Sequence, residues 1–539
     1  MEMKQMKLNY SPLISEAIEK QRYNDFFHYD LFSDNAYSKV IEDMNYSSSE
    51  RTKMVDHLLK YNTSLNCGEK TNENILSLQN EDTFAVVAGQ QAGFLLGPLY
   101  TIHKILSLLS YAKDVQRKTG KKIVPIFWIA GEDHDYDEVN HLYFEHNDDV
   151  KKWIHPQKTT IKKPLTNIQF ESEHASIIQE VFQFVEETPY TKEVYSFIEE
   201  QYKRSTGWVD FFARLVLQLF KEEGLIVVDA HNPELRKMEI NHFQTLIENT
   251  EAIQAGLKET QSILRDNDYS LLINMDETCA HIFYVSEYGR QQLYYDKEKN
   301  LYFTKNGNIK MSKDELLAEL EIHPENFSTN VVTRPVMQQM IFPAVAFVSG
   351  PGEFGYWAEL KGVFEAIHMK MPIVLLRHGF TYVETNVLSK IQKMGLELED
   401  ISAQKIKDIR EQHYSTSSLE EAKLELDEVQ EEIVSHMKLS LQRVNEHAFD
   451  QLLFNKKIEQ TVAEVLKKEM EKSYINYVHM KKEKVKMYSS VLQALYPKDS
   501  YQERVYNMIY FLNKYGFDWI DYVKSLELGQ KDEHYMILL

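Results

Sequence analysis

Residues 89–104 combine glycines with polar side chains that could bind an anionic small molecule. The segment follows an apolar run and contributes Gly89, Gln90, Gln91, Gly97, Thr101, His103 and Lys104. Glycines let the backbone approach a ligand closely, and a helix starting at Gly97-Pro98, with Pro98 in its first turn, presents free N–H groups. Thr101 and Lys104, three residues apart, share one helix face. The segment predicts a phosphate or carboxylate site; the alternative is a tight structural turn, and the GxGxxG dinucleotide pattern is not met.

A second segment, residues 131–135, places ionisable side chains in succession after another apolar run. It reads Gly131-Glu-Asp-His-Asp135. Adjacent carboxylates perturb one another's pKa unless a cation or a hydrogen-bond donor compensates them. We interpret Asp133, His134 and Asp135 as candidates for general-base catalysis or for contact with a substrate amine. The alternatives are a metal site, whose ligand spacing would not be a standard one, and an acidic turn capping a helix at 136–142.

A third segment repeats the design of the first: an apolar run ends, glycines turn the chain and a helix follows. It contributes Ser349, Gly350, Gly352, Glu353, Tyr356 and Trp357. Aromatic rings beside a helix N-terminus suit stacking on a planar ligand, although core packing explains Trp357 equally well. Arg334 follows Asn330-Val-Val-Thr333 and precedes Pro335, and Arg377 follows the apolar run at 373–376. Either guanidinium could clamp a carboxylate through two hydrogen bonds or form a structural salt bridge.

Five apolar runs predict buried parallel strands, which would position the polar segments described above. They cover residues 84–88, 123–130, 225–229, 344–348 and 373–376, with helices expected at 98–117, 211–222, 234–264 and 356–368. Alternating strands and helices are typical of an α/β fold with a Rossmann-type, doubly wound parallel sheet. Ligands bind such sheets outside the carboxyl ends of the strands, where the polar segments would meet.

The remaining sequence predicts two insertions and two C-terminal regions. We expect a core of residues 1–395, which begins with helices and carries insertions at about 143–207 and 265–335, the second with a hairpin at 281–295. Residues 396–500 are expected to form an antiparallel coiled coil that turns at 447–455, because from about 417 to 495 apolar residues recur every three or four positions without Gly or Pro. Residues 501–539 should return to the core, where Arg504 and Asn507 offer a polar face for a nucleotide.

Composition and charge exclude several classes of protein. The net charge of −21 argues against nucleic-acid and anionic-membrane partners. No apolar stretch reaches the roughly 20 residues that span a bilayer, and the N-terminus lacks a signal-peptide core. The two cysteines, Cys67 and Cys279, form no CxxC pair. We therefore expect a reduced, cytoplasmic protein without a metal cluster.

The run Lys310-Met-Ser-Lys-Asp314 is similar to the KMSKS loop that holds ATP phosphates in class I aminoacyl-tRNA synthetases. It precedes the fourth predicted strand, whereas the KMSKS loop follows the fifth. Ser312 and Glu315 also form a capping-box pattern for a helix at 314–321. We therefore interpret this run as a helix cap.

Four motifs together resemble the cysteine ligases of bacillithiol biosynthesis, the BshC family. They are GQQAG-x3-GPLYTIHK (89–104), P-x-FWIAGEDHD (125–135), NVVTRP (330–335) and SGPGE-x2-YW-x-ELK (349–361). The resemblance extends over the whole chain. It implies a Rossmann-type core with connective insertions, a coiled coil that forms a homodimer, and a cytoplasmic ligase that joins L-cysteine to glucosaminyl-malate to give bacillithiol.

The implied reaction fits the candidate residues. It forms an amide between the cysteine carboxyl and the glucosamine amine, which requires activation by ATP or another nucleotide. Lys104, Arg334 and Arg377 are candidates to bind the malate carboxylates, and Asp133, His134 or Asp135 would accept the amine proton. Two alternatives are a nucleotidyltransferase-like enzyme acting on another small acid and a non-enzymatic dimeric scaffold or ligand sensor.

Overall fold

The core of the computed structural model is a five-stranded parallel sheet in the order β13–β12–β2–β3–β6. Its strands are β2 (Thr83–Gln90), β3 (Lys122–Ile129), β6 (Ile226–Asp229), β12 (Ala344–Ser349) and β13 (Ile373–Leu376). The chain adds β3 and β6 on one side of β2 and then β12 and β13 on the other, so the topological switch point lies between β2 and β12. The predicted doubly wound α/β fold is confirmed.

The structure describes residues 3–539 except 7, 9, 45, 47, 147–148, 160, 275, 399–400, 415, 446–451 and 530–533. The strands are buried on both faces, which explains their continuous apolar sequences. α5 packs against β2 and β3, whereas α3 and α9 pack against β6. The helices around the sheet are α1 (Pro12–Ile14), α2 (Ala36–Asp43), α3 (Ser48–Ser64), α4 (Glu69–Ser77), α5 (Tyr100–Thr119), α9 (Trp208–Leu219), α10 (Pro233–Met238), α11 (Ile240–Glu248), α12 (Thr250–Asp266), α14 (Thr333–Ile341), α15 (Pro351–Ala358) and α16 (Lys361–Glu365).

The helix after the first polar segment begins later than predicted. α5 starts at Tyr100, and a 3₁₀ turn at Phe94–Leu96 precedes it, so Pro98 is not in its first turn. Gly97 has φ +63°, which interrupts helical geometry. The N–H of Leu99 donates to Tyr506 O at 2.9 Å, so the C-terminal region covers this helix end.

The first insertion contains a β-hairpin and two helices. These are β4 (His141–His146), β5 (Asp149–Ile154), α7 (Ile177–Phe182) and α8 (Thr191–Arg204). The helix predicted at 136–142 is wrong in its extent. Only α6 (Tyr136–Val139) is helical, because the chain enters β4 at His141 and pairs there with Ile154.

The second insertion forms a five-stranded antiparallel sheet in the order β10–β9–β8–β7–β11. Its strands are β7 (Cys279–Ser286), β8 (Gly289–Asp296), β9 (Leu301–Phe303), β10 (Lys310–Ser312) and β11 (Phe327–Thr329). The predicted hairpin is confirmed as β7–β8, with Gly289 at φ +90°. Ser312 and Glu315 form both bonds of a capping box at α13 (Lys313–Ile322). The KMSK run is therefore a helix cap, as interpreted.

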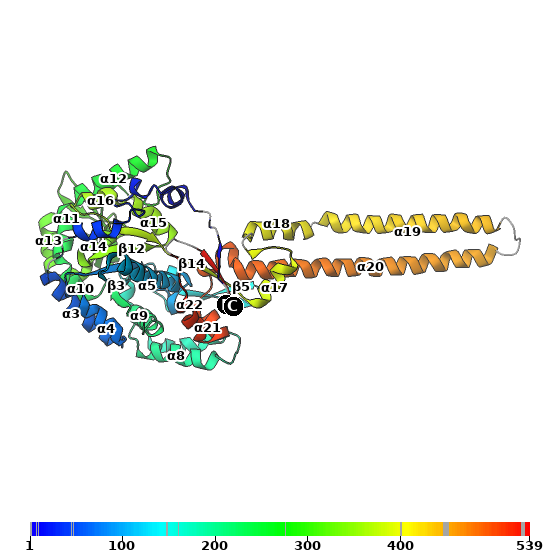
Figure 1. The fold of residues 1–539 in the computed structure, drawn as a ribbon, viewed down its shortest axis with the longest axis horizontal. Coiled ribbons are helices and arrows are strands. Elements are labelled where there is room, and N and C mark those ends of the chain that lie inside the picture. The colour runs from blue at the N-terminus through cyan, green and yellow to red at the C-terminus, as the bar shows by residue number, and fades with distance from the viewer. Residues whose placement is uncertain are drawn as a thin grey trace.

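The C-terminal region projects from the core as an antiparallel pair of long helices (Figure 1). It contains α17 (Thr385–Lys393), α18 (Ala403–Tyr414), α19 (Thr416–Asn445) and α20 (Leu452–Leu495). Of the predicted turn at 447–455, residues 447–451 lie outside the described part and 452–455 belong to α20. No helix within the described residues combines the length and apolar character of a membrane span.

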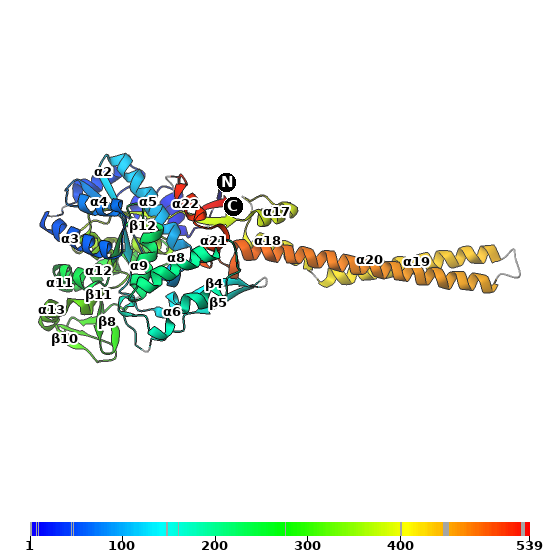
Figure 2. The same cartoon turned by 90° about the horizontal axis from the view of Figure 1, so that it is seen from below.

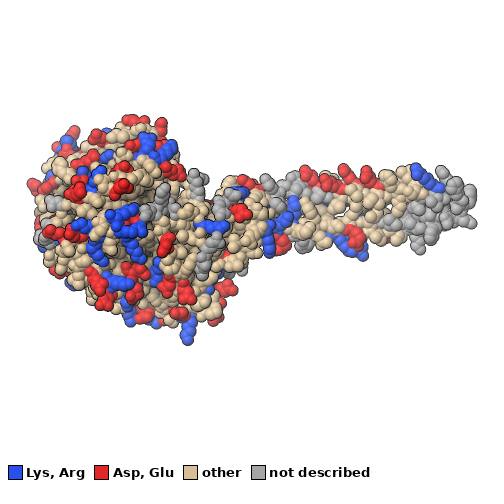
Figure 3. Space-filling model, in the orientation of Figure 1, with Lys and Arg blue, Asp and Glu red and all other residues tan. Residues whose placement is uncertain are grey.

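The last residues return to the core through α21 (Met508–Tyr515) and α22 (Asp518–Ser525). The sequence did not predict the small sheet that follows. In it β15 (His534–Leu538) lies between β1 (Met3–Met6) and β14 (Gly379–Val383), which brings the two termini together at the base of the coiled coil (Figure 2). On the face shown in Figure 3, acidic and basic side chains intermix over the core.

Candidate active site

The polar segments after β2, β3 and β12 meet at the carboxyl edge of the parallel sheet and form two adjoining cavities. The switch-point cavity, of about 430 Å³, is lined by Gly89, Gln90, Gln91, Tyr100, Lys104, Arg334, Gly350, Pro351, Gly352, Glu353, Tyr356, Arg377 and Arg504. The acidic cavity, of about 270 Å³, is lined by Glu132, Asp133, His134, Asp135, Phe283, Arg290, Thr329, Asn330, Val331 and Arg334. Arg334 lines both cavities, so they share a wall.

Lys104 is the central cation of the switch-point cavity. Its Nζ donates to Gly89 O at 2.8 Å, to Gln90 Oε1 at 3.1 Å and to Glu353 Oε2 at 2.5 Å. Burial lowers the pKa of Lys104, and Glu353 partly offsets this effect. Burial would raise the pKa of Glu353, but Lys104 and Arg334 hold it below its ordinary value. The contact between Lys104 and Glu353 fixes the loops after β2 and β12 to each other.

The switch-point cavity has an excess of positive charge. Arg334 lies 3.6 Å from Glu353 and hydrogen-bonds Tyr356, and Arg377 forms a two-pronged pair with Glu503 at 2.6 and 2.8 Å. Arg504 is exposed and has no ion pair with any residue that the structure describes. Four cations thus face two carboxylates, an arrangement that suits a ligand with more than one negative charge.

Asp133 connects the two cavities. Its Oδ2 accepts from Gln91 Nε2 at 2.5 Å, and Gln91 lines the switch-point cavity. Its Oδ1 accepts the backbone N–H of His134 at 2.7 Å, which fixes the carboxylate plane. Asp135 lies at the rim instead, with 47% of its side chain exposed and Lys162 at 3.9 Å. Asp133 is therefore the better-oriented carboxylate of the pair.

Glu132, which precedes Asp133, serves to hold the fold together. Its side chain is buried, pairs with Arg236 of α10 at 2.5 Å and accepts from Thr329 Oγ1 of β11 at 2.7 Å. Arg236 in turn pairs with the buried Glu239. The turn after β3 is thereby tied both to the core and to the antiparallel sheet.

Gly131 is required by close packing beneath this turn. A Cβ at this position would lie 2.2 Å from both Asp229 Oδ1 and Thr166 Oγ1, which hydrogen-bond each other at 2.8 Å. We expect Gly131→Ala to lower the free energy of unfolding by about 1–3 kcal/mol, because the turn must shift to relieve this overlap. Urea unfolding measures the effect, with Gly352→Ala as the control, since a Cβ there meets nothing within 4 Å. Equal stability of the two variants would contradict the prediction.

Several predicted site residues do not line either large cavity. The ring nitrogens of His103 contact Glu503 at 2.7 Å and Tyr382 at 3.1 Å, and Trp357 stacks on Phe347 with ring centroids 4.5 Å apart. Ser349 donates a hydrogen bond to Leu375 O, and Asn507 donates to Leu95 O and Gly97 O. Gly97 and Thr101 line a separate small cavity of about 30 Å³ beside Gln90 and Gln91. The remaining predicted residues line at least one of the two cavities.

Among the site residues that the sequence reasoning missed are Tyr100, Glu503 and Arg290. Tyr100 lines the switch-point cavity, with the Arg377 guanidinium 5.9 Å from its ring centroid. Glu503 anchors Arg377, and Arg290 enters the acidic cavity from β8. Tyr100 directly precedes predicted residues and Glu503 directly precedes the predicted Arg504, so both could have been included, whereas Arg290 carries no local signal. Within the described residues, no cluster of three or more His, Cys, Asp or Glu side chains could hold a metal ion.

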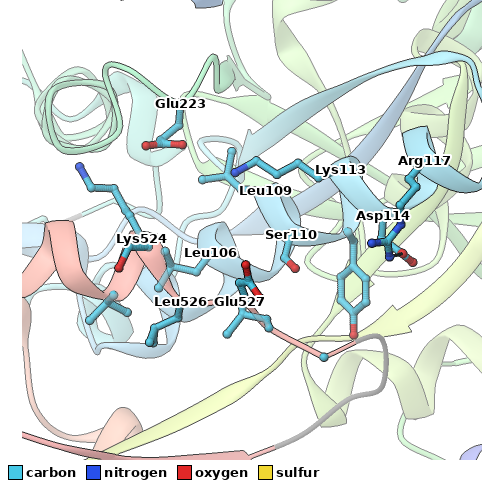
Figure 4. Close-up of a pocket in the computed structure, with 15 residues that line it drawn as sticks. Leu106, Leu109, Ser110, Lys113, Asp114, Arg117, Glu223, Lys524, Leu526 and Glu527 are labelled. Carbon is cyan, nitrogen blue, oxygen red and sulfur yellow. Dashed lines mark hydrogen bonds and ion pairs between the residues drawn. The ribbon is translucent and has the colours of Figure 1, made fainter. Parts of the chain in front are cut away.

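A larger cavity, of about 610 Å³, lies on the outer face of α5 beside the segment after α22 (Figure 4). Leu106 and Leu109 contribute apolar surface, and Lys113, Lys524, Glu223 and Glu527 contribute charges of both signs. None of the predicted site residues lines it. The chemistry expected from the sequence is therefore gathered at the sheet edge and not in this cavity.

Comparison with known proteins gives a family match over nearly the whole chain. The model for the N-terminal Rossmann-like domain of bacillithiol biosynthesis BshC matches residues 1–378, and that for the BshC C-terminal coiled-coil domain matches residues 380–539. Proteins named "Putative cysteine ligase BshC" from Bacillus cereus (strain AH187) and Bacillus anthracis (strain CDC 684 / NRRL 3495) are 34% and 35% identical over 549 residues, with 100% of each chain covered. A solved Campylobacter jejuni structure, described as a "putative arginyl t-RNA synthetase", covers 86% of this chain and 99% of its own at 11% identity, with a TM-score of 0.22.

Proposed function

Because the chain belongs to the BshC family of bacillithiol biosynthesis, as its motifs indicated, we propose that it joins L-cysteine to glucosaminyl-malate in the last step of that pathway. The bond formed is the amide between the cysteine carboxyl and the glucosamine amine. The observation that carries this proposal is the pair of cavities that share Arg334. A ligase must hold two substrates with their reacting atoms adjacent, and adjoining cavities of different charge can do so.

The switch-point cavity is the proposed site for the malate part of glucosaminyl-malate. Lys104, Arg334 and Arg377 present cations from three different segments, and charge-assisted hydrogen bonds to carboxylates are among the stronger polar contacts in proteins. Gly89, Gly350 and Gly352 leave the backbone accessible beside them. The glucosamine amine would then point towards Asp133 and the acidic cavity.

The cysteine carboxylate requires activation, for which we propose ATP or another nucleotide. Arg504, exposed at the edge of the switch-point cavity, is the cation available for its phosphates. Asn507 is not proposed for this role, because its amide holds the carbonyls of Leu95 and Gly97. In the acyl-transfer step the amine nitrogen bonds to the cysteine carbonyl carbon, the bond to the activating group breaks, and the amine proton passes to Asp133.

The test of the proposed function is direct product formation. Purified protein with L-cysteine, glucosaminyl-malate and ATP should form bacillithiol, detected by mass spectrometry, and replacing ATP by other nucleotides identifies the cosubstrate. Absence of product with every nucleotide would overturn the ligase proposal. Pyrophosphate release in the absence of cysteine would favour the nucleotidyltransferase alternative, and unaltered thiol pools in a deletion strain would favour the scaffold.

We further propose a homodimer formed through α19 and α20, in the cytoplasm, where the two free cysteines would stay reduced. Leu426 and Met437 of α19 are partly buried, whereas Val429 and Ile433 of the same apolar repeat are 46% and 40% exposed. Exposed apolar side chains on a long helical pair are typical of an oligomer interface. The second copy would cover them.

Replacing Val429 and Ile433 together by Glu should convert the dimer to a monomer, because burying two carboxylates opposes association. Sedimentation equilibrium measures the mass. Glu425→Lys is the control, since Glu425 is already exposed and charged and its replacement should leave the mass unchanged. A double variant that sediments like the unmodified protein would place the interface elsewhere.

A further inference from the structure

Arg290 contacts His134 from a distant part of the chain. Its Nη1 lies 2.9 Å from His134 Nδ1, and the two residues are separated by 156 positions. A guanidinium has hydrogen-bond donors and no acceptor, and it stays protonated in proteins. His134 Nδ1 must therefore accept this hydrogen bond, so the ring proton resides on Nε2.

The Arg290 side chain is fixed by three further contacts. Its Nε donates to Ser328 Oγ at 2.8 Å, its Nη2 donates to Thr329 O at 2.6 Å, and its guanidinium lies 3.7 Å from the ring centroid of Phe283. All three partners belong to the antiparallel sheet of the second insertion. That sheet therefore holds the turn after β3 at two points, Glu132 through Thr329 and His134 through Arg290.

His134 Nε2 is available to a ligand. Within the described residues it forms no hydrogen bond, and its nearest charged neighbour is Asp135 Oδ1 at 3.7 Å. The other charged groups facing the ring are Asp133, with Oδ1 3.9 Å from Nδ1, and Lys162. Burial and, second to it, Arg290 lower the pKa of His134, while the two aspartates oppose this effect. The neutral ring with Nε2–H is thus the form favoured near neutral pH.

We propose that Arg290 is a positioning residue that makes His134 a neutral hydrogen-bond donor, whose Nε2–H is directed at an anionic oxygen of the bound substrate. The proposal rests on the proposed function for the identity of that substrate. It assigns proton acceptance to Asp133 and not to His134, because a ring nitrogen that already accepts from a cation is a poor base. A neutral imidazole N–H can stabilise charge that develops on an acyl or phosphoryl oxygen.

The tautomer can be measured without any enzymatic activity. In ¹⁵N-histidine-labelled full-length protein, with His134→Gln used for assignment, Nδ1 should carry a lone pair and Nε2 a hydrogen, without titration near pH 6.5. In Arg290→Met the pKa of His134 should rise and both tautomers should appear. The control is Arg51→Met, which removes another buried arginine that donates to the carbonyls of Leu78 and Thr83. Unchanged His134 signals in Arg290→Met would overturn the proposal, as would a mixed tautomer in the unmodified protein.

Substitutions of His134 test whether its side chain acts as a hydrogen-bond donor or as a base. We expect His134→Ala to lower kcat by about 100-fold or more, the effect typical of losing one such donor. His134→Gln keeps an N–H at the corresponding position and should retain at least about tenfold more activity than His134→Ala. Equal loss in both variants would overturn the donor role. If the unmodified protein forms no bacillithiol, the proposed function fails, whereas the NMR result still decides the role of Arg290.

Discussion

Replacing Asp133 by Asn should lower kcat by about 100- to 10,000-fold, the range expected when a general base is lost. The substitution conserves shape, and the remaining carbonyl oxygen can still accept the His134 N–H that now bonds Oδ1 at 2.7 Å. The Gln91 amide can turn so that its oxygen faces the new NH₂ group. We therefore expect the free energy of unfolding to change by less than about 1 kcal/mol. Bacillithiol formation at saturating substrates and urea unfolding measure the two quantities.

Asp135→Asn is the matched control for this experiment. Asp135 carries the same functional group two residues away but lies at the rim of the acidic cavity, 47% exposed. Its replacement should change kcat by less than about tenfold. A solvated carboxylate that does not connect the two cavities is not held in a fixed position relative to the substrate amine. A large loss in Asp135→Asn with a small one in Asp133→Asn would exchange the two roles. Small losses in both would remove the carboxylates from the chemistry.

The parallel sheet was predictable because each of its strands is a short apolar run with a polar segment after it. The second run was predicted at 123–130, and β3 spans Lys122–Ile129. Such patterns are local in sequence, and the rule that ligands bind at the carboxyl ends of parallel strands then brings the three polar segments together. The sheet of β1, β15 and β14 was missed because runs of four or five residues without alternation fit several structures.

Which side chains face the cavities was harder to predict than which segments form them. Successive residues on an α-helix point about 100° apart, so Lys104 and its neighbour His103 cannot face one cavity together. Lys104 reaches Glu353, whereas His103 turns to Glu503 and Tyr382. The same geometry sends Tyr356 to the cavity and Trp357 to the core. Residue type alone did not distinguish these neighbours.

Contacts between distant segments were beyond prediction from the sequence. Arg290 lies on a hairpin of the second insertion, and Glu503 lies in the region that returns after the coiled coil. Arg290 is far in sequence from every predicted polar segment, and although Glu503 directly precedes the predicted Arg504, nothing local indicates that it pairs with Arg377. Their roles follow from tertiary packing, which places a donor on His134 and a carboxylate on Arg377.

Replacing Lys104 by Met should both destabilise the fold and abolish activity. Lys104 is 3% exposed, and loss of its side chain leaves Gly89 O, Gln90 Oε1 and the largely buried carboxylate of Glu353 without their cation. Breaking a buried ion pair by removing one partner costs about 3–5 kcal/mol, because an uncompensated charge remains. Arg334, at 3.6 Å from Glu353, would compensate it only in part. Urea unfolding should show this loss, whereas Lys113→Met on the exposed side of the same helix should stay within about 0.5 kcal/mol of the unmodified protein.

The double variant Lys104→Met with Glu353→Gln separates stability from ligand binding. It removes both charges, so most of the lost stability should return, since a neutral amide can still accept the Gly350 N–H that now bonds Glu353 at 2.9 Å. Activity should stay at least about 100-fold below that of the unmodified protein, because the cation proposed for the malate carboxylate is still missing. A double variant that recovers both stability and activity would show that Lys104 only neutralises Glu353. A double variant that recovers stability but not activity would show that Lys104 binds the ligand.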